Sequence, residues 1–131
     1  MRIMDSKFYV SFEAARLLKE KGYNEETDYI IDEDNCMMNS HYILNEDLSE
    51  CVCSCPTKVE AIDWLESKGI VVELSYDDQA HMDNARWEYF IYTHDKDGWA
   101  EAMVCSWHES NYYKTRLKAE EAAIIKALEL L

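Results

Sequence analysis

Five residues in the first half of the chain have side chains that can bind a metal ion, namely Cys36, His41, Cys51, Cys53 and Cys55. Thiolate and imidazole groups are the usual ligands of zinc and related ions. Structural zinc sites, however, have two residues between paired cysteines, whereas one residue separates the last three cysteines here. In a strand these cysteines would share one face at a spacing of about 7 Å, too splayed for one tetrahedral ion. Because free cysteine is often buried, we expect small core residues and no metal or other cofactor; a metal-binding cysteine cluster is the alternative.

Nine carboxylates lie between Gly22 and Thr57, in a stretch that has no lysine or arginine. They are Glu25, Glu26, Asp28, Asp32, Glu33, Asp34, Glu46, Asp47 and Glu50. A calcium loop starting at Asp32 would need glycine at its sixth position and glutamate at its twelfth, and the chain has neither. Unpaired like charges repel one another, so the stretch indicates either a solvated acidic face or a surface that docks onto a basic partner. We predict partner binding by the first eight of these residues.

A hydrolytic site would need a nucleophile beside a base, and one segment offers the residue types. Cys105 or Ser106 would be the nucleophile and His108 the base. Cys105 and His108 are three positions apart near the end of an expected strand, so their side chains would point to opposite faces. The chain has three glycines, of which two are expected to end helices, and this leaves no glycine-rich loop for an oxyanion or a phosphate. We therefore predict that the protein is not an enzyme.

The composition limits the compartment and the classes of partner. A chain of 131 residues, 48% of them hydrophobic, has the usual size of one domain. Its formal net charge of −14 disfavours contact with nucleic-acid backbones and anionic membranes. The first residues have no apolar signal core, and the number of cysteines is odd, at five. We expect a single cytoplasmic domain, residues 1–131, with reduced thiols and no direct binding to nucleic acid or membrane.

Three helices are predicted from their start and stop signals. The first begins after Ser11, a good N-cap residue, and the second begins at Thr57, where the sequence Thr-Lys-Val-Glu is a capping box. Gly22 and Gly69 suit the position that follows a helix C-cap. The third helix spans residues 115–131, where apolar residues recur at helical spacing.

The remaining elements are strands. We expect a meander of three strands at residues 70–76, 86–93 and 99–107, and two short strands at 29–31 and 42–44. Asp97-Gly98 predicts a tight hairpin turn in the meander, and Asn45-Glu46-Asp47 predicts a turn after the short strands. The order of elements predicts the α+β class: a small antiparallel sheet, the meander plus one or two short strands, with about three helices packed mainly on one face.

The aromatic side chains of the second half are too many for one face of that sheet. They are Trp87, Tyr89, Phe90, Tyr92, Trp99, Trp107, Tyr112 and Tyr113. Helices can cover one face, so aromatic residues on the other face would form a patch that a second copy of the chain could cover. A homodimer is therefore one alternative for the function.

Three blocks of the chain carry a resemblance to a known family. They are residues 9–23 (YVSFEAARLLKEKGY), residues 55–65 (CPTKVEAIDWL) and the closing helix after Tyr113, with Glu120, Glu121 and Ala122. In these blocks the chain resembles a family of small uncharacterised proteins encoded by phages and prophages of gut Bacteroides-type bacteria. The resemblance implies a phage or prophage origin and implies no activity. Members of that family have alanine where this chain has Cys55, which argues against a ligand role for Cys55.

Charge, composition and resemblance together predict a small acidic, non-enzymatic binding protein that engages a basic surface of a host protein. Such binding would weaken as salt screens the charges. The alternatives are a structural or assembly protein that acts as a homodimer, and a protein that binds metal through its cysteine cluster.

Overall fold

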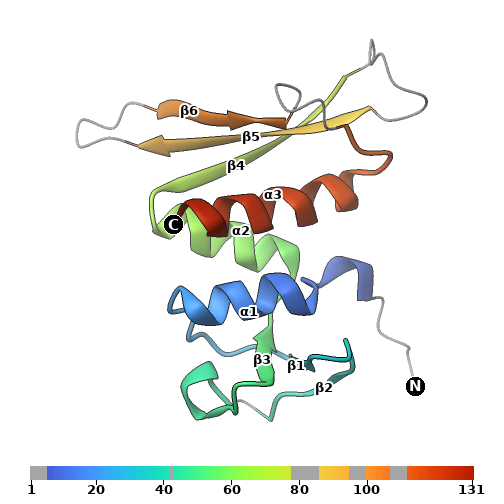
Figure 1. The fold of residues 1–131 in the computed structure, drawn as a ribbon, viewed down its shortest axis with the longest axis vertical. Coiled ribbons are helices and arrows are strands. Elements are labelled where there is room, and N and C mark those ends of the chain that lie inside the picture. Colours follow the sequence, from blue (N-terminus) through green and yellow to red (C-terminus); the bar gives the residue numbers. More distant parts are fainter. Residues whose placement is uncertain (1–5, 42, 78–85, 95–99, 107–111) are drawn as a thin grey trace.

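Two three-stranded antiparallel sheets lie at opposite ends of the molecule, and three helices lie between them (Figure 1). The computed structural model describes residues 6–41, 43–77, 86–94, 100–106 and 112–131. The smaller sheet has the order β2-β1-β3, with β1 Tyr29–Asp32, β2 Met37–Asn39 and β3 Val52–Cys55. The larger sheet has the order β4-β5-β6, with β4 Ile70–Tyr76, β5 Trp87–His94 and β6 Ala100–Cys105. The helices are α1 Phe12–Glu20, α2 Lys58–Ser67 and α3 Arg116–Leu130, and the short 3₁₀ helices are η1 Ser6–Phe8 and η2 Asn45–Asp47. The predicted α+β class is confirmed.

The predicted starts of the three helices are confirmed. At each start a side chain accepts a hydrogen bond from a backbone amide of the first turn. The Ser11 hydroxyl accepts the amide of Ala14 at 3.2 Å. At α2 the complete capping box is present, with the Thr57 hydroxyl accepting from the Glu60 amide and the Glu60 carboxylate accepting from the Thr57 amide. Thr115 caps α3 in the same way. Each cap satisfies a helix amide that has no partner inside the helix.

The end of α1 also follows the prediction. Gly22 has a φ of 96°, a left-handed conformation that glycine adopts without a steric penalty. The amide of Tyr23 then donates to the Leu18 carbonyl at 2.9 Å, and that of Gly22 to Lys19 at 3.2 Å. These two bonds form a Schellman motif, which turns the chain sharply toward the smaller sheet.

The short strands form a sheet of their own rather than extending the meander. The predicted strand at 29–31 is confirmed as β1, but the one at 42–44 is wrong for Ile43 and Leu44, and Tyr42 lies outside the described residues. The segments that pair with β1 are instead β2 and β3, the latter in the register Ile31↔Cys53. This pairing places buried Ile31 beside buried Cys53 and Cys55 on the side packed against α1. The predicted turn at 45–47 is the 3₁₀ helix η2.

The meander forms the larger sheet, whose one face is covered by α2 and α3. Strands β4 and β5 pair from Ile70↔Thr93 to Tyr76↔Trp87, and β5 pairs with β6 with a bulge between Ile91 and Tyr92. The predicted turn at Asp97-Gly98 and both predicted ends of the last strand lie outside the described residues. The sequence expectation that helices cover mainly one face holds for this sheet.

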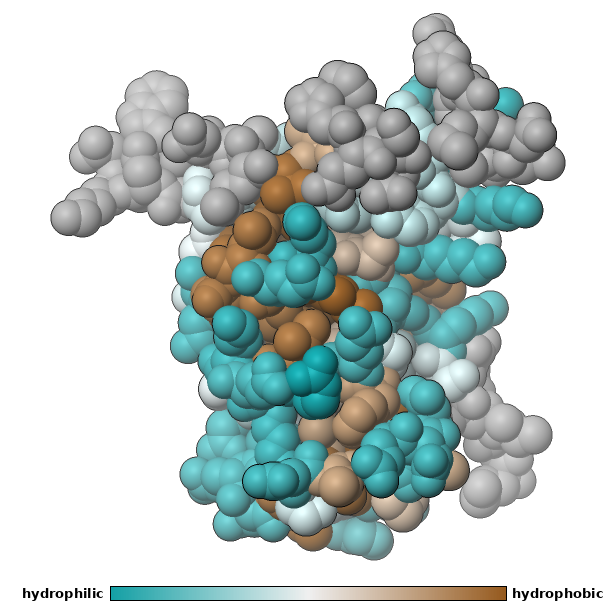
Figure 2. Space-filling model, viewed as in Figure 1, coloured by the Kyte–Doolittle hydropathy of each residue, from teal (hydrophilic) through white to brown (hydrophobic). Residues whose placement is uncertain are grey.

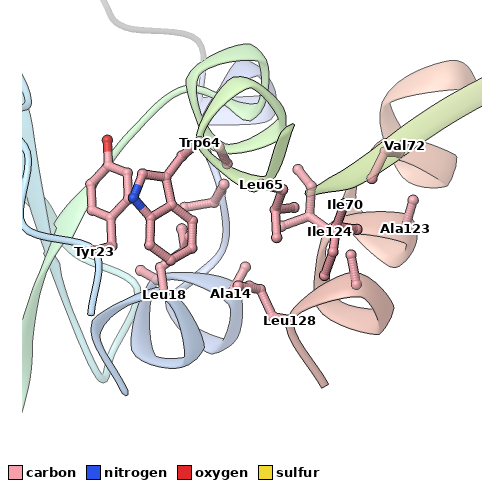
Figure 3. Packing of buried hydrophobic residues seen from close by; sticks show 14 of the residues in the cluster. Ala14, Leu18, Tyr23, Trp64, Leu65, Ile70, Val72, Ala123, Ile124 and Leu128 are labelled. Carbon is pink, nitrogen blue, oxygen red and sulfur yellow. The ribbon is translucent and has the colours of Figure 1, made fainter. Parts of the chain in front are cut away.

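The core lies where the three helices meet (Figure 3). Leu18 of α1, Leu65 of α2 and Leu128 of α3 are completely buried. The ring of Tyr23 packs edge-on against Trp64, with 5.4 Å between centroids. Because α1 contacts the smaller sheet and α3 contacts the larger one, a single core joins both halves of the chain. Among the described residues, no helix combines the length and apolar composition that crossing a membrane requires.

Candidate functional site

The predicted partner-binding carboxylates are almost all on the surface. Seven of the eight are exposed and Asp32 is half-buried. One oxygen of Asp32 accepts the amides of Asp34 and Cys36, both at 2.9 Å. Asp32 therefore shapes the turn between β1 and β2, a common role of aspartate, and is less exposed to a partner than Glu33 and Asp34.

The carboxylates do not form one continuous surface, because two asparagines anchor them at opposite ends of α1. The Asn35 side chain accepts the amide of Phe12 at 3.3 Å, which holds the β1–β2 turn with its acids at the start of the helix. The Asn24 side chain accepts the amide of Glu46 at 3.0 Å, just beyond the end of the helix. A helix of nine residues separates the two anchors by about 13 Å. Asp28 lies in a third place, a 330 Å³ pocket that Tyr9 and His41 also line.

The group beyond the end of α1 comprises Glu25, Glu46, Asp47 and Glu50, which we call the acidic rim. All four residues are exposed. Glu46 and Glu50 line the same 410 Å³ groove, together with Lys19 and Tyr23. Hydrophilic residues cover this part of the molecule, over the loop after α1 and η2, at the lower left of Figure 2. The acidic rim is thus a hollowed, negatively charged surface.

A lysine holds the chain that carries this rim. The ammonium group of Lys19 donates to three backbone carbonyls, those of Leu48 at 3.2 Å, Ser49 at 2.6 Å and Val52 at 2.9 Å. These three bonds match the three donors of a lysine, and they fix the segment between η2 and β3. Sequence reasoning missed this anchor, because Lys19 lies 29 residues or more before its acceptors.

A buried asparagine provides a second anchor. The side-chain amide of Asn45 donates to the Tyr23 carbonyl, and its oxygen accepts the amide of Ser54, both at 2.7 Å. Asn45 is 3% exposed, so these bonds are shielded from water. The rim residues next to it, Glu46 and Asp47, are therefore carried on backbone held from both sides.

The rim carboxylates form no ion pair in the part of the chain that the structure describes, and the ammonium group of Lys19, which lines the same groove, donates to backbone carbonyls instead. The ion pairs there are Arg16–Glu20 at 2.6 Å and Arg116–Glu120 at 3.0 Å, each within one helix. None of the eight predicted residues takes part in either pair. Their negative charge is therefore directed to solvent and is available to a partner.

The four cysteines before α2 divide into two pairs with opposite surroundings. Cys36 and Cys51 are exposed, so the core role expected for the last three of these cysteines is wrong for Cys51, whereas Cys53 and Cys55 are fully buried. Burial raises the pKa of both inner thiols, that of Cys55 to about 12, with Glu121 adding to the effect. The Cys55 thiol donates to the Val10 carbonyl at 3.3 Å. The inner thiols therefore stay protonated, and among the described residues no three metal-binding side chains gather.

Two of the three residues considered for hydrolysis, Cys105 and Ser106, make contacts that stabilise the larger sheet. The Ser106 hydroxyl is buried and accepts the amide of Tyr89 at 2.9 Å. Cys105 is half-buried and is paired with Phe90 across the sheet. His108 lies outside the described residues. Ser106, just beyond the last residue of β6, thus serves to satisfy the amide of Tyr89.

The aromatic residues of the larger sheet lie on both faces. Tyr89 is buried and its ring stacks on that of Tyr113, with 6.1 Å between centroids. Phe90 and Tyr92 follow the alternation to the face away from the helices, where their rings stack at 6.3 Å. Both residues on that face are half-buried. Among the described residues, the open face therefore presents the stacked pair Phe90 and Tyr92, and Trp99 and Trp107 of the predicted set lie outside the described residues.

Comparisons of the chain with protein-family models, curated proteins and solved structures gave no match. The resemblance to the phage and prophage family stays a prediction, and the geometry of the acidic rim carries the functional argument.

Proposed function

We propose that the protein is a small acidic, non-enzymatic binding protein whose acidic rim engages a basic surface of a host protein. The main support is that the rim carboxylates are exposed and form no intramolecular ion pair in the described part of the chain. In addition, Lys19 and Asn45 fix the backbone that carries them. A fixed backbone lowers the ordering cost of binding. Unpaired charge of one sign attracts a surface of the other and speeds the encounter.

The resemblance described above supports a phage or prophage origin, in which the partner would belong to the host cell. One such partner is the nucleic-acid-binding groove of a host enzyme, since a groove lined by lysine and arginine is complementary to clustered carboxylates. Binding there would occlude the groove without any chemistry by the protein itself.

The test uses two double variants that remove equal charge. Glu46→Gln with Asp47→Asn neutralises the acidic rim, and Glu33→Gln with Asp34→Asn neutralises the turn at the other end of α1. We expect a host protein retained by the immobilised wild type to be retained by the turn variant and bound about tenfold more weakly by the rim variant. Retention should fall as salt rises. Equal retention by both variants, or retention unchanged from low to high salt, would contradict the proposal.

A second candidate function is homodimerisation through the open face of the larger sheet. The stacked rings of Phe90 and Tyr92 favour it, because half-buried aromatic rings are typical of interface cores. Sedimentation equilibrium tests it: a dimer that Phe90→Ser dissociates is expected, and a monomer at high micromolar concentration would rule it out.

A further inference from the structure

A third pocket, distinct from the acidic rim and from the pocket of Asp28, lies at the other end of α1. It has a volume of 280 Å³ and is formed where the start of α1, the smaller sheet, the start of α2 and α3 meet. Its apolar wall includes Val10, Ile31 and Met37. Two residues of opposite charge, Lys58 and Glu121, also line it. A small pocket with an apolar wall and a few polar groups is the usual form of a ligand site.

The cation of this pocket is buried. Lys58, the first residue of α2, is 6% exposed, and its ammonium group donates to the Lys7 carbonyl. An ammonium group has three donors, and no ion pair of Lys58 is found among the described residues. Lysine is rarely so buried without a negatively charged partner, because the charge loses its hydration.

Only one of the two carboxylate oxygens of Glu121 has a hydrogen-bond partner. One oxygen of Glu121 accepts the amide of Ser11 at 3.0 Å. This bond ties the N-cap residue of α1 to α3. The other oxygen is buried and has no hydrogen-bond partner. Buried carboxylate oxygens are normally satisfied, so this atom has the capacity to accept from a bound donor. The amide of Phe12, the first residue of α1, is taken by Asn35.

We infer that the pocket binds a free α-amino acid with an apolar side chain. The ammonium group of such a ligand would donate to the unpartnered oxygen of Glu121, and its carboxylate would accept from Lys58. The side chain would lie against Val10, Ile31 and Met37. A peptide terminus carries only one of the two charges next to its end, so the pairing of a buried ammonium group with a half-buried carboxylate favours the free zwitterion.

The experiment titrates the intact protein with L-leucine and with two analogues that each lack one charge, 4-methylpentanoate and isoamylamine. Calorimetry gives the affinities, and the methyl resonances of Val10, Ile31 and Met37 report the place of binding. We expect saturable shifts of these methyl groups with L-leucine or L-methionine, and binding at least about tenfold weaker for each analogue. Equal affinity for a singly charged analogue, or no saturable shift with any of the common amino acids up to about 10 mM, would overturn the inference.

Matched variants test the role of the carboxylate. Glu121→Gln keeps an oxygen for the Ser11 amide but removes the charge, and Glu129→Gln makes the same change at an exposed position of α3. We expect about a tenfold loss of amino-acid affinity for the first and no loss for the second. If Glu121→Gln does not fold, the analogue series on the wild type decides alone. Wild-type affinity in a folded Glu121→Gln variant would overturn the inference.

Discussion

Asn45 and Ser54 are buried next to each other, but only the side chain of Asn45 has hydrogen-bond partners. Replacing each by alanine should therefore change the free energy of unfolding by different amounts. Asn45 makes two hydrogen bonds of 2.7 Å, whereas the hydroxyl of Ser54 is buried and has no partner. Asn45→Ala would leave the Tyr23 carbonyl and the Ser54 amide unpaired, so we expect a loss of about 2–4 kcal/mol in the free energy of unfolding. Ser54→Ala removes an unsatisfied group and should change it by less than about 0.5 kcal/mol, or raise it.

Urea denaturation of the two variants measures these changes. A Ser54→Ala variant as unstable as Asn45→Ala would mean that the hydroxyl has a partner after all.

The buried thiol of Cys55 predicts a loss of stability in alkali. Its pKa is raised to about 12 from an ordinary value of 9.0, chiefly by burial. The folded state therefore keeps a proton that the unfolded chain releases, so the stabilising difference is complete below about pH 9 and disappears as the pH rises toward about 12. Burial raises the pKa of Tyr23 as well, which acts in the same direction.

Urea denaturation at several pH values in this window tests the alkaline effect. Cys55→Ala should be less stable than the wild type at neutral pH because it leaves a cavity, but its stability should fall less steeply with pH. An identical pH slope in the wild type and the variant would show that Cys55 does not contribute.

At the scale of elements, Lys19 determines whether the segment that carries the acidic rim is fixed. Lys19→Met keeps the aliphatic stem and removes the three bonds to the carbonyls of Leu48, Ser49 and Val52. We expect a loss of about 1.5–3 kcal/mol, the range for hydrogen bonds to a charged group. Hydrogen exchange of the amides of residues 45–52 should become faster.

Lys118→Met is the control, since Lys118 is exposed on α3. Exchange rates in residues 45–52 that are the same in both variants would contradict the anchoring role of Lys19.

The sequence predicts the elements that depend on contacts between neighbouring residues and misses those that depend on distant contacts. The caps at Ser11 and Thr57 depend on residues three positions away, so the sequence alone reveals both helix starts. The choice of β3 over residues 42–44 depends instead on which segment reaches β1 and fits against α1. The separation of the acidic rim from the carboxylates of the β1–β2 turn likewise depends on Asn24 and Asn35, whose partners lie 22 and 23 residues away. No local pattern encodes such distances.

At the scale of the whole molecule, the net charge of −14 predicts that salt stabilises the fold. Salt screens the repulsion among exposed carboxylates, and among the described residues those of the acidic rim form no ion pair that would offset it. The melting temperature should therefore rise between low ionic strength and about 0.15 M salt. Glu46→Gln with Asp47→Asn should raise the melting temperature at low salt and make the rise with salt smaller.

Differential scanning calorimetry gives these temperatures, and Lys118→Gln, which makes the charge more negative, should have the opposite effect. A melting temperature independent of salt in the wild type would contradict this account.

The bond between the Ser11 amide and Glu121 joins positions that are 110 residues apart. A ribosome makes α1 well before α3, so the amide at the start of α1 waits for the synthesis of 110 further residues before this carboxylate is available. During that wait the face of α1 that packs on α3 has no cover from it. The nascent chain therefore leaves this face open to proteases and chaperones until α3 has emerged.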